Sequence, residues 1–226
     1  MELLNLDVIR NYGPTLLLGL GNTVLLTLIV IVLAGLLAIP LALVRTSKSA
    51  FVRLPFEALV EIVRGTPLIL QLFYVYYVLP SAGVQLEPFT AAVVALTMNY
   101  TAYLSEVYRG GIKAVPDGQR YAAAALGMTP TKAFLRIILP QAFRIVTPTL
   151  GNYFIALFKD TALASVVTVN ELLYSGNLVS SATYQYFTVY TVTGILYFIA
   201  GFPASLLVRY LEKRSRSSMQ RRRRPV

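Results

Sequence analysis

Five long stretches of this 226-residue chain contain no Asp, Glu, Lys or Arg. A helix needs roughly 20 mostly apolar residues to cross the hydrocarbon core of a bilayer, which is about 30 Å thick. Charged residues make up only 13% of the chain and hydrophobic residues 56%, so polar side chains are too few to cover a soluble domain. The pattern predicts an all-α, polytopic membrane protein. The charge-free stretches are residues 11–44, 65–86, 88–105, 145–158 and 172–208.

These stretches predict five transmembrane helices in a single transmembrane domain that covers residues 1–226. A loop over residues 109–136 follows the third span, and a basic tail over residues 211–226 follows the fifth. The first residues lack the basic segment of a signal peptide, so we expect the first apolar segment to remain as a span. The expected spans cover residues 19–42, 57–79, 88–108, 137–158 and 187–210.

Basic residues gather in alternate connecting segments. The segments after the first, third and fifth spans hold sixteen of the 20 Lys and Arg residues. The positive-inside rule predicts that these segments are cytoplasmic, with the N-terminus outside and the C-terminus inside. The net charge of +10 therefore reports topology and does not indicate a nucleic-acid partner. The block Arg221–Arg224 is typical of a solvated tail that fixes orientation, and attraction to anionic membrane lipid is the alternative.

Several kinds of chemistry are excluded by composition. The chain has no Cys and no His, which removes thiolate metal sites, the commonest metal ligand and the commonest general base. It also lacks the GxxxxGK[ST] pattern of a phosphate-binding loop. We therefore predict no catalytic residues, no metal site and no cofactor in this chain.

Polar groups inside the expected spans mark a candidate pathway. Glu61 and Arg64 share one helix face, and they either line an aqueous path or neutralise each other between helices. The break at Gly65-Thr66-Pro67 forms either the wall of a polar pathway or an ordinary kink. We predict a substrate path near the midplane of the membrane, between two subunits. Its residues are Arg64, Gly65, Thr66, Pro67, Gln71, Asn99, Tyr103, Asn152 and Asp160.

The 109–136 loop carries signals for two short helices on the inner face. Asp117 is a candidate N-cap for the first, and Gly127 fits the left-handed position that ends it. Thr129-Pro130 then supplies a capping hydroxyl and a proline at the first position of the second helix. A membrane protein without an energy source of its own is expected to dock a partner on such an element.

Four sequence motifs resemble those of ATP-binding-cassette importer permeases, and three of the four resemble the polar amino-acid subgroup (histidine, glutamine or arginine type). Their order and spacing match, and the resemblance covers roughly residues 14–211. The motifs are residues 118–128 continuing to Ile137–Ala142, residues 61–68, residues 108–112 with Val115-Pro116, and Lys159-Asp160-Thr161 with Leu163. Two positions depart from the family pattern. Tyr121 stands where the loop usually has Glu, and Ala162 replaces a common Ser.

The resemblance implies a type I importer permease in a bacterial plasma (inner) membrane, working in a dimer with the same or a homologous permease. It also implies a cytoplasmic ATPase dimer, which carries ATP and Mg²⁺, and an extracytoplasmic binding protein that delivers a polar amino acid for import. The loop over residues 116–135 would couple to the ATPase. The implied coupling residues are Gln119, Tyr121, Ala122, Ala123, Gly127, Met128 and Lys132.

The alternative is an ATPase-independent secondary carrier or channel for small polar solutes. A carrier usually contains repeats with interrupted helices in matching positions, and five spans do not divide into two equal halves. A channel would need a repeated filter motif, and none is visible. Co-purification of a soluble ATPase would distinguish the permease from this alternative.

Overall fold

The computed structural model describes residues 4–221, with side chains to residue 210, and its regular elements in that range are all helical. The predicted basic tail, with Arg221–Arg224, lies outside the described residues except for the helical backbone up to Arg221. The helices are α1 (Leu6–Val44), α2 (Ala50–Gly65), α3 (Leu68–Phe73), α4 (Pro88–Lys113), α5 (Asp117–Ala125), α6 (Pro130–Ala133), α7 (Leu139–Asp160), α8 (Leu172–Thr183) and α9 (Tyr186–Arg221). Short π or 3-10 segments are η1 (Tyr74–Val78), η2 (Leu79–Ala82), η3 (Phe134–Ile138) and η4 (Thr161–Val167).

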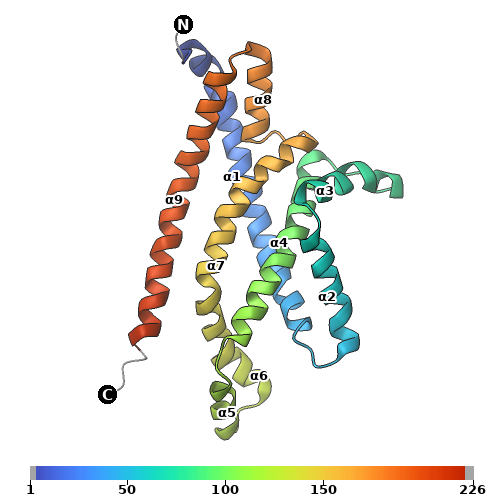
Figure 1. Cartoon of the computed structure of the whole chain (residues 1–226), viewed down its shortest axis with the longest axis vertical. Helices are drawn as coiled ribbons and strands as arrows, with labels where there is room; N and C mark the ends of the chain where they lie inside the picture. Colours follow the sequence, from blue (N-terminus) through green and yellow to red (C-terminus); the bar gives the residue numbers. More distant parts are fainter. Residues whose placement is uncertain (1–3, 222–226) are drawn as a thin grey trace.

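Four helices, α1, α4, α7 and α9, run lengthwise through the molecule (Figure 1). The start of α1 and helix α8 lie at one end, and α5, α6 and the turn between α1 and α2 lie at the other. The basic segments that follow the first and the third expected spans therefore lie at the same end of the structure. This grouping agrees with the sidedness that the charge pattern predicts.

The tightest seam joins α1 to α4. Small residues at four-residue spacing on α1, such as Ala34 and Ala38, are buried in one cluster with Ala91, Ala92 and Ala95 of α4. Small side chains let helix backbones approach closely, which is how helices associate where burial from water supplies no driving force. The seam therefore holds α1 and α4 together as one wall of the fold.

Large apolar side chains cover the outside of the helices. Leu18, Leu36, Phe198 and Ile199 are each more than half exposed. A soluble protein does not expose apolar surface on this scale, whereas lipid solvates it. Among the described residues, α1 and the Tyr186–Tyr210 part of α9 are each long and apolar enough to cross a membrane, and the bent pair of α2 with the segment to Ala82 is a third if it counts as one span. The count of five spans stays a prediction.

The expected second span, residues 57–79, is broken more sharply than a kink. Helix α2 ends at Gly65, Thr66 and Pro67 are extended, and the next segment leaves at an angle of 103°. Proline has no N–H to continue the helix and disfavours helical geometry in the residue before it. The break therefore separates this segment into two helices and leaves backbone groups free at the bend.

The loop over residues 109–136 folds as the sequence predicts, with one correction. Gly127 has a φ of +71°, and the Met128 N–H donates to the Ala123 carbonyl at 3.1 Å, which closes α5 in the expected left-handed cap. Thr129 accepts from the Lys132 N–H and caps α6. The prediction for Asp117 was wrong, because Pro116 occupies the N-cap position and Asp117 is the first helical residue.

Helix α8 was not predicted, since its residues were assigned to a connection. Its N-cap is Glu171, a fully buried carboxyl group that accepts from the N–H groups of Leu173 and Tyr174 at 2.9 and 2.6 Å. The same side chain accepts from the Tyr197 hydroxyl on α9 at 2.8 Å and lies 3.5 Å from the Thr23 hydroxyl on α1. Glu171 thus joins three helices at one end of the fold.

We expect Glu171→Ala to destabilise the protein by about 1–3 kcal/mol, because two partly buried N–H groups and one partly buried hydroxyl lose their acceptor. The measurement is the temperature at which half of the detergent-purified protein has aggregated, with the remaining soluble protein quantified by gel filtration. Glu171→Gln is the matched control, since its amide oxygen still accepts a hydrogen bond, and it should lose less stability. An unchanged midpoint for Glu171→Ala would contradict the capping role.

Candidate functional site

A polar cavity of about 420 Å³ lies where the break after α2 meets α4 and α7. Seven of the nine residues predicted for the substrate path line it. Tyr100, Tyr153, Leu68 and Ala156 complete the wall. The predicted residues that line the cavity are Arg64, Gly65, Thr66, Pro67, Asn99, Tyr103 and Asp160.

A chain of amides supports the bend. The Gln71 amide donates to the Val63 carbonyl at 2.7 Å and to the Thr66 hydroxyl at 2.8 Å. Asn99 of α4 in turn donates to the Gln71 side-chain oxygen at 3.0 Å. Gln71 is buried and satisfies a carbonyl that the missing helical turn leaves free. It therefore lies behind the cavity wall and connects the break to α4.

Arg64 supplies the positive charge of the cavity. Its guanidinium lies over the Tyr103 ring, 5.3 Å from the centroid, and the Tyr103 hydroxyl donates to the Arg64 carbonyl at 3.4 Å. Glu61 approaches the guanidinium at 3.5 Å, but its own side chain is 70% exposed. This separation is at the long limit for a hydrogen bond, and it joins two residues of α2 and not two different helices. Glu61 therefore neutralises Arg64 only weakly, and the charge of Arg64 stays available to the cavity.

Asp160, at the end of α7, supplies the negative charge. The Tyr100 hydroxyl of α4 donates to its carboxylate at 2.6 Å. Tyr153 lies two helical turns before Asp160 and packs against the rings of Tyr100 and Tyr103, with centroids 6.3 and 6.0 Å apart. The cavity therefore combines one cation, one carboxylate and three tyrosine rings in a confined space.

Sequence reasoning missed Tyr100 and Tyr153, although the sequence contained a signal for Tyr153. Tyr153, Ala156 and Asp160 follow helical spacing and share one face of α7. Asn152 was predicted from its polarity and its expected depth in the membrane, and it is exposed and absent from the cavity wall. Adjacent helical residues point in different directions, so choosing Tyr153 excludes Asn152 from the same face.

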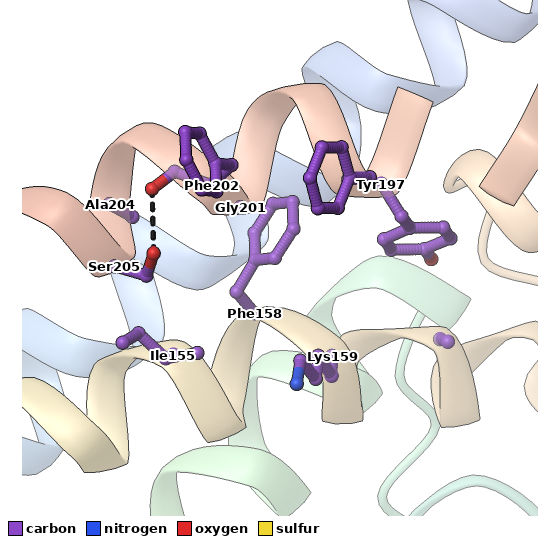
Figure 2. A pocket seen from close by; sticks show the side chains of 10 residues that line it. Ile155, Phe158, Lys159, Tyr197, Gly201, Phe202, Ala204 and Ser205 are labelled. Atoms are coloured by element: carbon purple, nitrogen blue, oxygen red, sulfur yellow. Dashed lines mark hydrogen bonds between the residues drawn. The ribbon is translucent and has the colours of Figure 1, made fainter. Parts of the chain in front are cut away.

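A second cavity, of about 450 Å³, lies between α7 and α9 (Figure 2). Phe158 projects from α7 toward α9, where its ring meets that of Tyr197 at a centroid distance of 5.8 Å. Apart from Lys159 and Ser205, the side chains around it are hydrophobic or aromatic. A zwitterion would lose its hydration there, and its ammonium group would find no carboxylate among the described residues that line the cavity. The cavity with Arg64 and Asp160 is the better candidate for a polar solute.

The predicted coupling residues lie on α5, on the turn that follows it and, for Lys132, on α6. Tyr121 is 74% exposed, Ala122 and Lys132 are exposed, and Ala123 is buried. The Gln119 side chain accepts from Gln141 at the start of α7, and the exposed Gly127 and half-buried Met128 form the turn. Helix α5 therefore packs on the bundle through one side and leaves Tyr121 free on the other.

The residues that the structure describes contain no group of three or more acidic side chains placed to hold a metal ion. The polar groups of the cavity are instead those that recognise a charged organic solute. Guanidinium and carboxylate groups in one cavity suit a molecule that carries both signs of charge.

Comparisons with known proteins agree with this description. A family profile described as a binding-protein-dependent transport system inner membrane component matches residues 31–217. A probable amino-acid ABC transporter permease of Sinorhizobium fredii is 41% identical over 199 residues, covering 88% of this chain and 86% of the relative. An L-cystine transport system permease of Bacillus subtilis is 42% identical over 173 residues, covering 76% and 74%.

Solved structures share the fold. A crystal structure of an amino acid ABC transporter with histidines superposes with a TM-score of 0.87 at 35% identity, covering 93% of this chain and 99% of that one. An inward-facing methionine ABC transporter superposes with a TM-score of 0.69 at 21% identity, covering 87% and 96%, and supports the fold alone.

Proposed function

The chain belongs to the family of inner membrane components of binding-protein-dependent transport systems, and from this premise we propose how it carries its substrate. It is the permease component of an amino-acid ABC importer in the inner membrane, and it is not an enzyme, since such systems keep ATP hydrolysis on a separate subunit. Our proposal is that the chain pairs with a second permease and passes a polar amino acid through the cavity at the α2–α3 break.

The observation that carries this proposal is that Arg64 and Asp160, which carry opposite charges, line the same cavity. An amino acid is a zwitterion, so its carboxylate meets the guanidinium of Arg64 and the free backbone groups of the break. Its α-ammonium, or a cationic side chain, meets Asp160. Charge-assisted hydrogen bonds of this kind are the strong ones, and they replace the hydration that the solute loses.

A second permease would close the path. The Arg64–Asp160 cavity is open on one side in the single chain, and apolar side chains such as Leu59 and Ile62 are exposed on α2. A path between two copies, or between this chain and a homologous permease, would cover that opening from the other side. Five spans, with the N-terminus outside and the C-terminus in the cytoplasm, complete the proposed topology.

Coupling to the ATPase is proposed to run through residues 116–135. Tyr121 projects from α5, and Gly127 and Thr129 fix the angle between α5 and α6. An ATPase dimer that closes on this element would move α7 directly, because η3 joins α6 to α7 without a loop. Asp160 lies at the far end of α7, so motion at the inner loop reaches the cavity through one continuous helix.

The test is ATPase stimulation of the reconstituted complex, with its binding protein, by each of twenty amino acids. We expect one or a few polar amino acids to stimulate hydrolysis and to accumulate inside the vesicles. Transport by the permease without any co-purifying ATPase would contradict the proposal and favour the carrier or channel.

A further inference from the structure

A second polar cavity, the basic cleft, lies at the end of the molecule that holds α5 and α6. It has a volume of about 710 Å³ and is bounded by the end of α1, the start of α2, the end of α4, α5 and the start of α6. Four cations and one carboxylate line it: Arg45, Arg53, Lys113, Arg120 and Glu57. The Arg64–Asp160 cavity, by contrast, balances one charge of each sign.

Two of the four cations already have close partners. Arg45 is only 3% exposed and binds Glu106 at 2.8 Å, which also pairs with Arg109. Arg53 binds Glu57 at 3.4 Å. These pairs neutralise one side of the basic cleft and fix its shape.

The other two cations remain available to a ligand. Arg120 approaches Asp117 at 3.7 Å, but both side chains are largely exposed, so water screens this contact. Lys113, in the last turn of α4, makes no ion pair among the described residues. The basic cleft therefore has excess positive charge concentrated at Lys113 and Arg120, and it suits an anion.

An apolar groove continues from the basic cleft. This groove, of about 180 Å³, shares Leu43, Ile112 and Phe134 with the cleft and extends along α1 and α7 to Ile39 and Val146. Apart from the half-buried Tyr108, its walls are entirely hydrophobic. A polar anion such as free phosphate would use the cleft and leave this groove empty.

We propose that the basic cleft and the apolar groove together bind one anionic phospholipid of the inner leaflet. The phosphate lies near Lys113 and Arg120, and an acyl chain passes Leu43 and Phe134 into the groove. Basic pockets between membrane helices on the cytoplasmic side are suited to anionic headgroups. Only the choice of leaflet rests on the proposed orientation of the permease. The joined cleft and groove are the same in either orientation.

The test measures lipid bound to the complete transporter, purified in detergent and stripped of lipid, by mass spectrometry of the intact complex. We expect phosphatidylglycerol to bind at one site per permease chain, about tenfold more tightly than phosphatidylcholine. The double variant Lys113→Gln/Arg120→Gln should weaken phosphatidylglycerol binding by about tenfold or more, since each basic residue near a lipid surface contributes about 1 kcal/mol.

The matched control is Arg136→Gln, which removes an exposed cation of the same loop that does not line the cleft, and it should leave phosphatidylglycerol affinity unchanged.

A second variant, Leu43→Trp, narrows the passage that the cleft and the groove share, at a partly exposed position, and it should weaken lipid binding as the double variant does. This single variant keeps the test decisive if the double variant does not assemble. Unchanged phosphatidylglycerol affinity in the variants that assemble, or displacement of phosphatidylglycerol by inorganic phosphate, would overturn the lipid site. The test measures lipid binding and not transport. A negative result would therefore reject the lipid site without rejecting the proposed function.

Discussion

Replacing Asp160 with Asn is expected to raise the KM for uptake by about tenfold to a hundredfold. The substitution removes the only carboxylate among the described residues that line the Arg64–Asp160 cavity, and it keeps a side-chain oxygen that still accepts from the Tyr100 hydroxyl. The loss corresponds to one charge-assisted hydrogen bond, worth about 1.5–3 kcal/mol, between the protein and the α-ammonium or cationic side chain. The KM is measured from uptake of the identified amino acid into proteoliposomes, with the ATPase and binding protein present.

Tyr100→Phe is the control for Asp160→Asn. It removes the 2.6 Å hydrogen bond to the carboxylate and leaves the charge in place, so we expect a smaller change in KM. Wild-type KM in Asp160→Asn would show that the substrate does not meet this carboxylate. A larger defect in Tyr100→Phe than in Asp160→Asn would assign the effect to the position of α7 and not to charge.

Gly127→Leu is expected to abolish coupled transport, lowering uptake by more than about tenfold, while the complex still hydrolyses ATP. Gly127 has a φ of +71°, a conformation that costs a residue with a Cβ about 1–2 kcal/mol, and the leucine side chain would project from the exposed turn between α5 and α6. The measurement is the ratio of amino acid transported to ATP hydrolysed by the reconstituted complex.

Gly83→Leu separates strain from docking. Gly83 also has a positive φ, of +86°, and open space where a Cβ would lie, but it follows η2 far from the inner loop. Both variants carry the same kind of backbone strain, and only Gly127 belongs to the proposed ATPase contact. Equal loss of coupling in the two variants, or normal transport in Gly127→Leu, would contradict the docking interpretation.

The parts of the fold that the sequence predicts well are those with strong local chemistry. Gly127, Thr129 and Pro130 each have one favoured role at a helix end, and the structure confirms them. Pro67 likewise requires a break, and the polar residues around it gather in one cavity. The helical class follows from the charge-free stretches, because lipid leaves few other ways to satisfy a backbone.

The parts that the sequence did not predict depend on distant contacts. Glu171 looks like a loop residue until Thr23 and Tyr197, on two other helices, close around it. The Arg45–Glu106 pair joins residues whose contact depends on how α1 lies against α4. Tyr100 becomes a site residue only because Asp160 lies opposite on α7. One sequence contains no information about which faces of two helices meet.

The small-residue seam between α1 and α4 has a mechanical consequence. Close backbone packing resists sliding, so these two helices should move as one rigid body, and the Arg45–Glu106 pair reinforces them at the end of the molecule that holds α5 and α6. The polar cavity, however, is lined by the break after α2, by α4, which is part of that body, and by α7, which is not. Its width is then set by the angle between the rigid pair and α7, and the Tyr100–Asp160 hydrogen bond is the contact whose length reports that angle.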